Sequence, residues 1–454
     1  MPKRNLVILG LAVLAALVAW AARRSGEHAR LYGEVTGHLR RSYLEPVEDE
    51  ALFDAAMQGM FERLDGQTGL VPASAASGAA DDAGASEAVA GVGLELALDP
   101  TGTPLVTTPV AGSPAWRAGI AAGDRIVAID GAATAGMRLR DAVAALRGVA
   151  GTDVVLDVAP PAGDIPETRD ERGALLASRR VELRRESLRT ETVAGDRRRA
   201  DGSWEFSLEG EEGVALVRVS GFSPSTADDL DRACAEIAAA GEPRGLILDL
   251  RGNRGGLLAA AVDVCDRFLD EGVIVSTRRR DAEPDRFEVR RALPGEVFAA
   301  VPMVVLVDGL TASSAEIVAA CLQDNGRATV VGSRTFGKGT VQSILPLSDG
   351  RSALRMTTAE YLRPSLANIH RHPHHDDADV WGVSPDPGHE ISPTAGVLET
   401  VHEWRWRRDA IPRHAAAAHV AATADASAAA LPRQIDPVIG RALAALGARP
   451  RGQP

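Results

Sequence analysis

The hydrophobic and polar positions of this chain follow three patterns in succession. An uninterrupted apolar run over residues 6–22 comes first, with basic residues on both sides. Apolar residues at helical spacing then predict helices over residues 27–65, with a break at Pro46. Between residues 213 and 400, buried-strand patterns alternate with amphipathic helical patterns. Such alternation is typical of an α/β layer around a largely buried sheet.

The apolar run has the composition of a membrane-targeting segment. Its 17 residues are at the short end for a membrane-spanning helix and slightly long for the core of a cleaved signal. Ala19-Trp20-Ala21 fits a cleavage site, whereas Trp20 also suits an interfacial anchor. We therefore expect residues 1–25 to be a signal-anchor or a signal peptide of an exported protein. A buried globular helix is the least favoured alternative.

Residues 71–160 change from a linker to a small domain. Residues 71–88 are small and polar, as in a flexible linker. Short strands, glycine turns and two helices are predicted next, over residues 91–96, 112–120, 123–131, 139–146 and 154–158. This order resembles a PDZ domain over residues 89–160. Such domains hold the carboxylate of a peptide C-terminus with backbone N–H groups of one loop. The resemblance places that loop at Gly91, Val92, Gly93 and Leu94.

The alternating region gives the most regular predictions. Strands are expected over residues 214–219, 245–250 and 303–307, and helices over residues 226–240, 257–269 and 313–324. Residues 401–454 contain an Ala-rich stretch and a closing helical pattern over residues 435–446.

Composition excludes several functional classes. The net charge of −12 argues against a nucleic-acid-binding surface, which needs clustered positive charge. Three cysteines are too few for a disulfide framework or a zinc site. Cys234, Cys265 and Cys321 lie on amphipathic helical patterns without an activating neighbour, so we expect them to pack as small hydrophobes.

Two glycine- and serine-rich segments follow predicted strands, where α/β proteins place functional loops. In residues 249–256, Gly255 and Gly256 let backbone N–H groups face an anion, including an oxyanion, although an ordinary strand-to-helix turn has the same composition. In residues 308–317, Ser313 begins a helix, where the helix dipole favours negative charge. Ser313 and Glu316 also have the spacing of a capping box, which many helices carry for structural reasons alone.

A third segment places Lys338 between two glycines at the start of a predicted apolar strand. Partial burial there would favour the neutral amine, so that the lysine could act as a base. Gln342 falls on the same strand face, with its α-carbon about 13 Å away in a straight strand. A bend at Gly339 or converging side chains must close that gap. The spacing of a phosphate-binding loop is absent.

A histidine-rich stretch follows the third segment. Imidazoles and carboxylates are suitable metal ligands, but ligands crowded this closely rarely all reach one ion. We therefore favour a solvated loop, and we predict neither a metal site nor a cofactor. The stretch contains His370, His372, His374, His375, Asp376 and Asp377.

Residues 27–400 resemble the carboxy-terminal processing (tail-specific) proteases, which are serine peptidases with a Ser–Lys dyad. The resemblance rests on Ala-Ser-Ser-Ala-Glu-Ile at residues 312–317 and Thr-Phe-Gly-Lys-Gly-Thr-Val-Gln at residues 335–342. Ser313 and Lys338 are 25 positions apart, as in the family, which selects Ser313 rather than Ser314. The resemblance implies that Ser313 is the nucleophile, that neutral Lys338 is the general base and that Gln342 orients Lys338.

The resemblance also implies an oxyanion hole made by the N–H groups of Ser314, Gly255 and Gly256. Two departures from the family pattern stand out. A double serine replaces the commoner Ser-Ala pair, and residues 366–369 replace a glycine-led turn ahead of an unusual insertion. Since Ser314 would contribute only its backbone, we expect the first departure to be tolerated.

These observations predict an α/β (α+β) layered peptidase core with an inserted, mainly-β PDZ domain and an N-terminal transmembrane or signal helix. We expect the peptidase to include residues 27–70 and 186–400, with residues 401–454 as a helical tail. The expected activity is that of an endopeptidase anchored to the inner membrane, with its body in the periplasm or outside the cell. Its expected partners are proteins with accessible C-termini, and a homo-oligomer or an adaptor protein is compatible with the sequence.

Two other functions remain as alternatives. The first is a catalytically inactive PDZ scaffold, against which the intact Ser313, Lys338 and Gln342 argue. The second is an acyl-CoA-type enzyme, for which the sequence carries no nucleotide-binding signal.

Overall fold

The computed structural model divides the chain into two compact units, described separately here. One unit runs up to Pro72 and includes Leu345–Thr357, and the other contains the remaining residues. The expected targeting segment and most of the expected linker lie outside the described residues. The structure describes residues 27–73, 90–99, 101–110, 112–160, 178–188, 191–280, 283, 286–372, 374–376, 378–410 and 432–448.

The first unit contains two helices and a small sheet. Helices α2 (Glu27–Ser42) and α3 (Asp49–Phe61) lie on either side of Pro46, as predicted. Strand β1 (Gly69–Pro72) pairs antiparallel with the first residues of β20 (Ser352–Leu362). Within the part of the chain that the structure describes, no helix is long and apolar enough to cross a membrane.

The small domain of the second unit is built around one antiparallel sheet with strand order β3-β4-β5-β7-β8. Its helix α5 (Leu139–Leu146) has the bounds predicted from the sequence. Val106, Ile126 and Leu156 are fully buried in its core. The other elements are β2 (Ala90–Gly91), β3 (Leu94–Leu98), β4 (Pro104–Pro109), α4 (Pro114–Arg117), β5 (Arg125–Ile129), β6 (Ala132–Ala133), β7 (Asp153–Ala159), β8 (Arg179–Arg184) and β9 (Glu186–Ser187).

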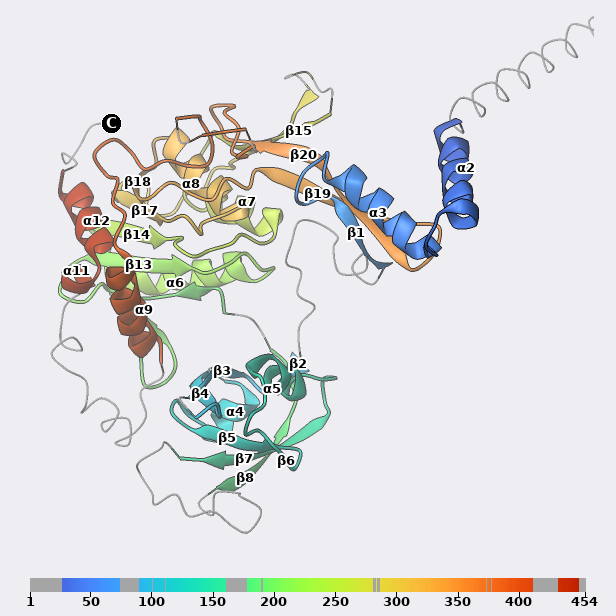
Figure 1. Cartoon of the computed structure of the whole chain (residues 1–454). Coiled ribbons are helices and arrows are strands. Elements are labelled where there is room, and N and C mark those ends of the chain that lie inside the picture. Colours follow the sequence, from blue (N-terminus) through green and yellow to red (C-terminus); the bar gives the residue numbers. More distant parts are fainter. Residues whose placement is uncertain are drawn as a thin grey trace, which may run out of the picture. The chain divides into compact units, whose positions relative to one another are not determined.

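The larger domain has a central sheet with strand order β10-β13-β14-β17-β18. Its last four strands are parallel and buried between helices (Figure 1). Alternate residues of each strand face two different cores, because successive side chains of a strand point to opposite faces. The strands are β10 (Val193–Ala194), β13 (Val214–Val219), β14 (Gly245–Asp249), β17 (Met303–Val307) and β18 (Ala328–Gly332).

One face of the central sheet is covered by α6 (Thr226–Ala240), α7 (Leu258–Asp266) and α8 (Ser314–Asp324), and the other by α12 (Pro437–Ala448). The helix predicted over residues 226–240 and the strand predicted over residues 303–307 are confirmed. The remaining elements are β11 (Arg197–Arg198), β12 (Trp204–Glu205), β15 (Val273–Arg279), β16 (Glu288–Arg291), β19 (Thr340–Pro346), α9 (Ala395–Asp409) and α11 (Pro432–Ile435).

The described part of residues 401–454, which the sequence predicts as a helical tail, packs on the core of the larger domain. Helix α9 runs through the expected boundary at residue 400. Arg405 and Arg408 of that helix pair with Asp196, which is fully buried. Helix α12 buries Val438 and Ile439 against the central sheet. The C-terminal helices therefore complete the core.

Candidate active site

Three loops meet where neighbouring parallel strands end. Residues 249–256 follow β14, residues 308–313 follow β17 and residues 333–339 follow β18, and these strands lie in that order in the sheet. Ala312 N–H donates to the carbonyl of Asn253 at 2.9 Å, and Phe336 N–H donates to the carbonyl of Thr311 at 2.9 Å. The serine turn is thus the middle loop. This edge of an open α/β sheet is where such folds place their sites.

Ser313 has a strained backbone at the junction of turn and helix. Its φ of 57° and ψ of −122° are unusual for a residue with a β-carbon, and its side chain is buried. A strained strand-to-helix turn is a known setting for a nucleophilic serine. The hydroxyl of Ser314, in contrast, donates to the carbonyl of Gly256 at 2.8 Å.

The buried carboxylate of Glu316 joins the serine turn to the lysine loop. Its Oε2 accepts from the N–H groups of Ser313 at 2.9 Å and Lys338 at 2.7 Å. Its Oε1 accepts from the Thr335 hydroxyl at 2.5 Å and the Gly337 N–H at 2.7 Å. Because the nitrogens of Ser313 and Lys338 contact one oxygen, they lie within about 6 Å of each other. Glu316 thus fixes the spacing of the two expected catalytic residues.

Sequence reasoning treated Glu316 only as a capping residue. The capping hydrogen bond to Ser313 is present, but the other three partners belong to the lysine loop. Burial raises the pKa of Glu316 above its ordinary 4.5, and these hydrogen bonds oppose that rise. A signal was present in the sequence, since Glu316 is the one charged residue in the first turn of α8 and is followed by an apolar run.

Lys338 is half-buried and lies in a loop, because β19 begins only at Thr340. The expectation that Lys338 begins a strand was therefore wrong. A β-carbon on Gly337 would lie 2.8 Å from Cβ of Arg371, and one on Gly339 would lie 2.5 Å from the His370 nitrogen. The neighbouring chain thus packs closely on both sides of Lys338, and the φ of 87° at Gly337 is not that of a strand.

Gln342 lies within β19 and is half-buried. Its Nε2 donates to the Thr340 hydroxyl at 3.4 Å. Since Lys338 precedes the strand, the even spacing of these two residues does not by itself place them on one strand face.

The glycine loop contacts the serine turn directly. A β-carbon on Gly255 would lie 2.8 Å from Cβ of Ser313 and 3.1 Å from the Ser314 nitrogen. The Gly255 N–H donates to Asn253 Oδ1 at 2.8 Å and therefore already has an acceptor other than an oxyanion. Of the three N–H groups expected to form an oxyanion hole, this geometry favours those of Gly256 and Ser314.

A buried ion-pair network supports the glycine loop. Arg251 contacts Asp249 at 2.7 Å and Asp436, which precedes α12, at 2.9 Å. Burial raises the pKa of Asp249, but the charge and hydrogen bonds of Arg251 outweigh burial and hold that pKa below its ordinary 3.8. A residue from the C-terminal helices therefore helps to fix the loop beside Ser313.

The expected peptide-binding loop of the small domain is a tight glycine turn. Gly93 has a φ of 76°, and a β-carbon there would lie 2.2 Å from Cβ of Ser113. Its carbonyl accepts from the Val110 N–H at 2.9 Å and the Ser113 hydroxyl at 3.2 Å. The loop residues Val92 and Gly93 lead into β3, which is an edge strand of the sheet.

The histidine-rich stretch packs beside the lysine loop. His370 Nδ1 lies 3.2 Å from the Gly337 carbonyl, and the rings of His372 and His374 stack at 5.4 Å between centroids. Among the described residues, which do not include Asp377, no group of three or more His, Cys, Asp or Glu is arranged to hold a metal.

The three cysteines are buried in the core of the larger domain. Burial raises the pKa of the Cys234 thiol to about 12 and also raises that of Cys265. Neither thiol is therefore suited to act as a nucleophile.

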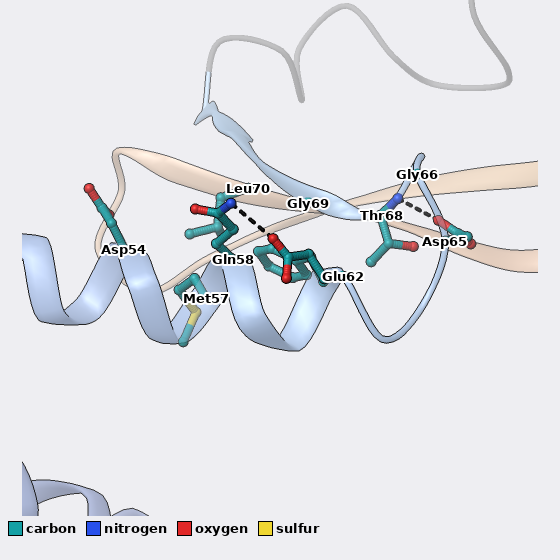
Figure 2. Close-up of a pocket in the computed structure, with 10 residues that line it drawn as sticks. Asp54, Met57, Gln58, Glu62, Asp65, Gly66, Thr68, Gly69 and Leu70 are labelled. Carbon is teal, nitrogen blue, oxygen red and sulfur yellow. Dashed lines mark hydrogen bonds between the residues drawn. The ribbon is translucent and has the colours of Figure 1, made fainter.

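A groove of about 490 Å³ lies in the first unit, between α3 and β1 (Figure 2). Along it Gln58 donates to Glu62 at 2.9 Å, and Thr68 N–H donates to Asp65 at 2.6 Å. None of the expected catalytic residues lines this groove.

Comparisons with known proteins identify the domains of this chain. The model of peptidase family S41 matches residues 213–387, and that of a PDZ domain matches residues 105–160, so the predicted PDZ domain is confirmed. A carboxy-terminal-processing protease of Bartonella bacilliformis is 33% identical over 342 residues, which are 74% of this chain and 71% of that protein. A carboxyl-terminal-processing protease of Synechocystis is 35% identical over 299 residues, which are 66% of this chain and 62% of that protein.

Among solved structures, a photosystem II D1 C-terminal processing protease is 28% identical. The match covers 83% of this chain and 92% of that one, with a TM-score of 0.42.

Proposed function

This chain belongs to the carboxy-terminal processing proteases of peptidase family S41 and is a serine-type peptidase, and we propose that Ser313 is its nucleophile and Lys338 its general base. The main support for the proposal is the Glu316 carboxylate. One of its oxygens accepts hydrogen bonds from the backbone N–H groups of both residues. The strained turn at Ser313 and the engaged hydroxyl of Ser314 support the choice between the two serines.

The proposed reaction is acyl transfer. Ser313 Oγ attacks the scissile carbonyl carbon while neutral Lys338 takes the hydroxyl proton. The N–H groups of Gly256 and Ser314 stabilise the tetrahedral oxyanion. As the carbon–nitrogen bond breaks, Lys338 returns the proton to the leaving amine. Water then attacks the acyl-enzyme with Lys338 again as base, which releases the new carboxylate and restores Ser313. Gln342 would orient Lys338.

Two substitutions test these roles. Ser313→Ala and Lys338→Ala should each abolish cleavage of a purified protein that carries an unstructured tail, whereas Ser207→Ala, at an exposed serine of the same domain, should not. Cleavage by either of the first two variants would contradict the proposed role of the substituted residue. Failure of the wild-type protein to react with a serine-directed acylating probe would favour the inactive scaffold instead.

We also propose that the PDZ domain binds the C-terminal tail of the substrate. Addition of the tail to the edge strand β3 would bring its carboxylate to the loop at Gly91–Leu94. The free edge of β3 and the tight turn at Gly93 support this mode. Two peptides that differ only in a free or an amidated C-terminus provide the test. Equal cleavage rates for both would argue against tail recognition.

We further propose that residues 1–25 direct export and tether the protein to the membrane. The support is the apolar run at residues 6–22 with its basic flanks. The full chain and a variant with Leu14→Arg and Leu17→Arg should be compared by cell fractionation. The wild type should be found in the membrane or exported fraction and the variant should not. The same distribution for both would contradict the proposal.

A further inference from the structure

The loops on the two sides of the serine turn differ in chemistry. Ala312 is hydrogen-bonded to Asn253 on one side, and Thr311 is hydrogen-bonded to Phe336 on the other. These two loops flank the serine turn. A substrate that crosses the turn with its scissile carbonyl at Ser313 would extend toward both of them. The exposed side chains of these loops are the groups that it meets.

On the first side, the exposed residue is Arg254. It makes no ion pair or hydrogen bond with the residues that the structure describes. Its neighbours are fixed, because Asn253 is fully buried and donates to the carbonyl of Val219 at 2.9 Å, and Gly255 packs against Ser313. Arg254 is therefore a cation on a rigid loop, and its charge is available to a ligand.

The reach of Arg254 is set by its place in the loop. A β-carbon on the next residue, Gly255, would lie 2.8 Å from Cβ of Ser313. The α-carbon of Arg254 lies about 3.8 Å from that of Gly255, because that is the spacing of consecutive residues. An extended peptide advances about 3.3 Å per residue. A guanidinium on this residue would therefore be within reach of substrate residues at about four positions or fewer from the cleaved bond.

On the second side, Phe336 is 57% exposed and lies two residues before Lys338. In the proposed reaction the leaving amine takes its proton from Lys338, which would place the leaving part of the substrate on the side of Phe336. The acyl part, which precedes the cleaved bond, then lies on the side of Arg254.

We propose that Arg254 forms a subsite for an acidic residue on the acyl side of the cleaved bond. This inference rests on the proposed peptidase function and adds a substrate class to it. A guanidinium binds a carboxylate through two parallel hydrogen bonds. Because the chain has a net charge of −12, a cation at this place also offsets the repulsion that an acidic substrate would otherwise meet.

The test uses peptides of one sequence and one C-terminus, with Glu or Gln at each of the four positions before the cleaved bond. The ratio of kcat/KM for the Glu and Gln peptides is measured in the wild type, Arg254→Gln and Arg254→Glu. For an exposed ion pair, the wild-type ratio should be about two to five at one position or more. It should fall to about one in Arg254→Gln and below one in Arg254→Glu.

Arg291→Gln provides the matched control, because Arg291 is an exposed arginine on β16 of a different sheet. Its ratio should equal that of the wild type, and the wild-type ratio should fall at high salt. Equal labelling by an acylating probe establishes that each variant is folded.

An unchanged ratio in Arg254→Glu, or an acidic preference found only after the cleaved bond, would overturn the inference. A wild-type protein that cleaves none of the peptides and does not react with the probe would contradict the proposed function itself, and the inference with it.

Discussion

Replacing Glu316 with glutamine tests whether one buried carboxylate holds the proposed nucleophile and the proposed base together. The carboxylate accepts four hydrogen bonds, two on each oxygen. An amide of the same shape has a single oxygen, and its NH₂ group must face two N–H or O–H donors. If the NH₂ group faces Ser313 and Lys338, both N–H donors lose their acceptor. If it faces Thr335 and Gly337, the Gly337 N–H loses its acceptor, whereas the Thr335 hydroxyl can turn and accept from the amide.

The structure sets the size of the effect. A buried donor without an acceptor costs about 1–3 kcal/mol, so one or two would cost about 1–6 kcal/mol if the loops stayed in place. The lysine loop is half-buried at Lys338 and can move to relieve this cost. A displacement of about 1 Å at a reacting group lowers a rate about 100-fold. We therefore expect kcat to fall about 100-fold or more in Glu316→Gln and the melting temperature to fall as well.

The assay is steady-state cleavage of a tailed peptide together with the rate of labelling by an acylating probe. KM should change much less than kcat, because Glu316 is buried away from bound substrate. Glu403→Gln, at an exposed position of α9, is the matched control and should retain the wild-type kcat. A folded Glu316→Gln protein with kcat within threefold of the wild type would refute the positioning role.

Three further predictions follow from contacts of single residues. Gly256→Ala should abolish cleavage in a kcat measurement, because the new methyl group would lie 2.2 Å from the carbonyl oxygen of Phe222, and an active variant would contradict that close packing. The pKa of Asp249 is lower in the folded protein than its ordinary value of 3.8. Its carboxylate therefore stabilises the fold fully at a pH above 3.8, and this stabilisation is lost as the pH falls through the lower, folded-state pKa. Asp249→Asn should therefore be less stable at pH 7 by about 3–5 kcal/mol, because Arg251 loses a buried partner, and its urea unfolding should lack that acid-dependent loss. Cys234, with a thiol pKa of about 12, should resist iodoacetamide at pH 8 until the protein unfolds, whereas labelling of the native protein detected by mass spectrometry would contradict its burial.

The candidate site residues that the sequence singles out are those whose signals are local. Ser313 begins a helix and Lys338 stands between two glycines, and both patterns are visible within a few positions. The role of Glu316 was not predictable in this way. Its partners in the lysine loop are 19 to 22 positions further along the chain, and only the parallel order of β17 and β18 brings them together.

The same distinction applies to the fold. The buried strands and amphipathic helices between residues 213 and 332 have apolar patterns that predict them well. Strand β16 is exposed along its whole length, so it lacks such a pattern. The helix predicted over residues 435–446 corresponds to α12, which begins at Pro437, but its periodicity did not reveal that the central sheet is its partner. Patterns identify an apolar face, whereas the surface that covers it depends on the whole chain.

The pairing of β1 with β20 has a consequence for how the chain folds during synthesis. Gln67, just before β1, is hydrogen-bonded to Arg355 across 288 positions of sequence. The first unit therefore cannot finish folding until most of the chain has left the ribosome, and contacts of such long range slow folding. During that interval β1 is a strand without its neighbour, open to pairing with other chains. A messenger truncated before the codon for Ser352 would leave that edge permanently exposed and its product prone to aggregation.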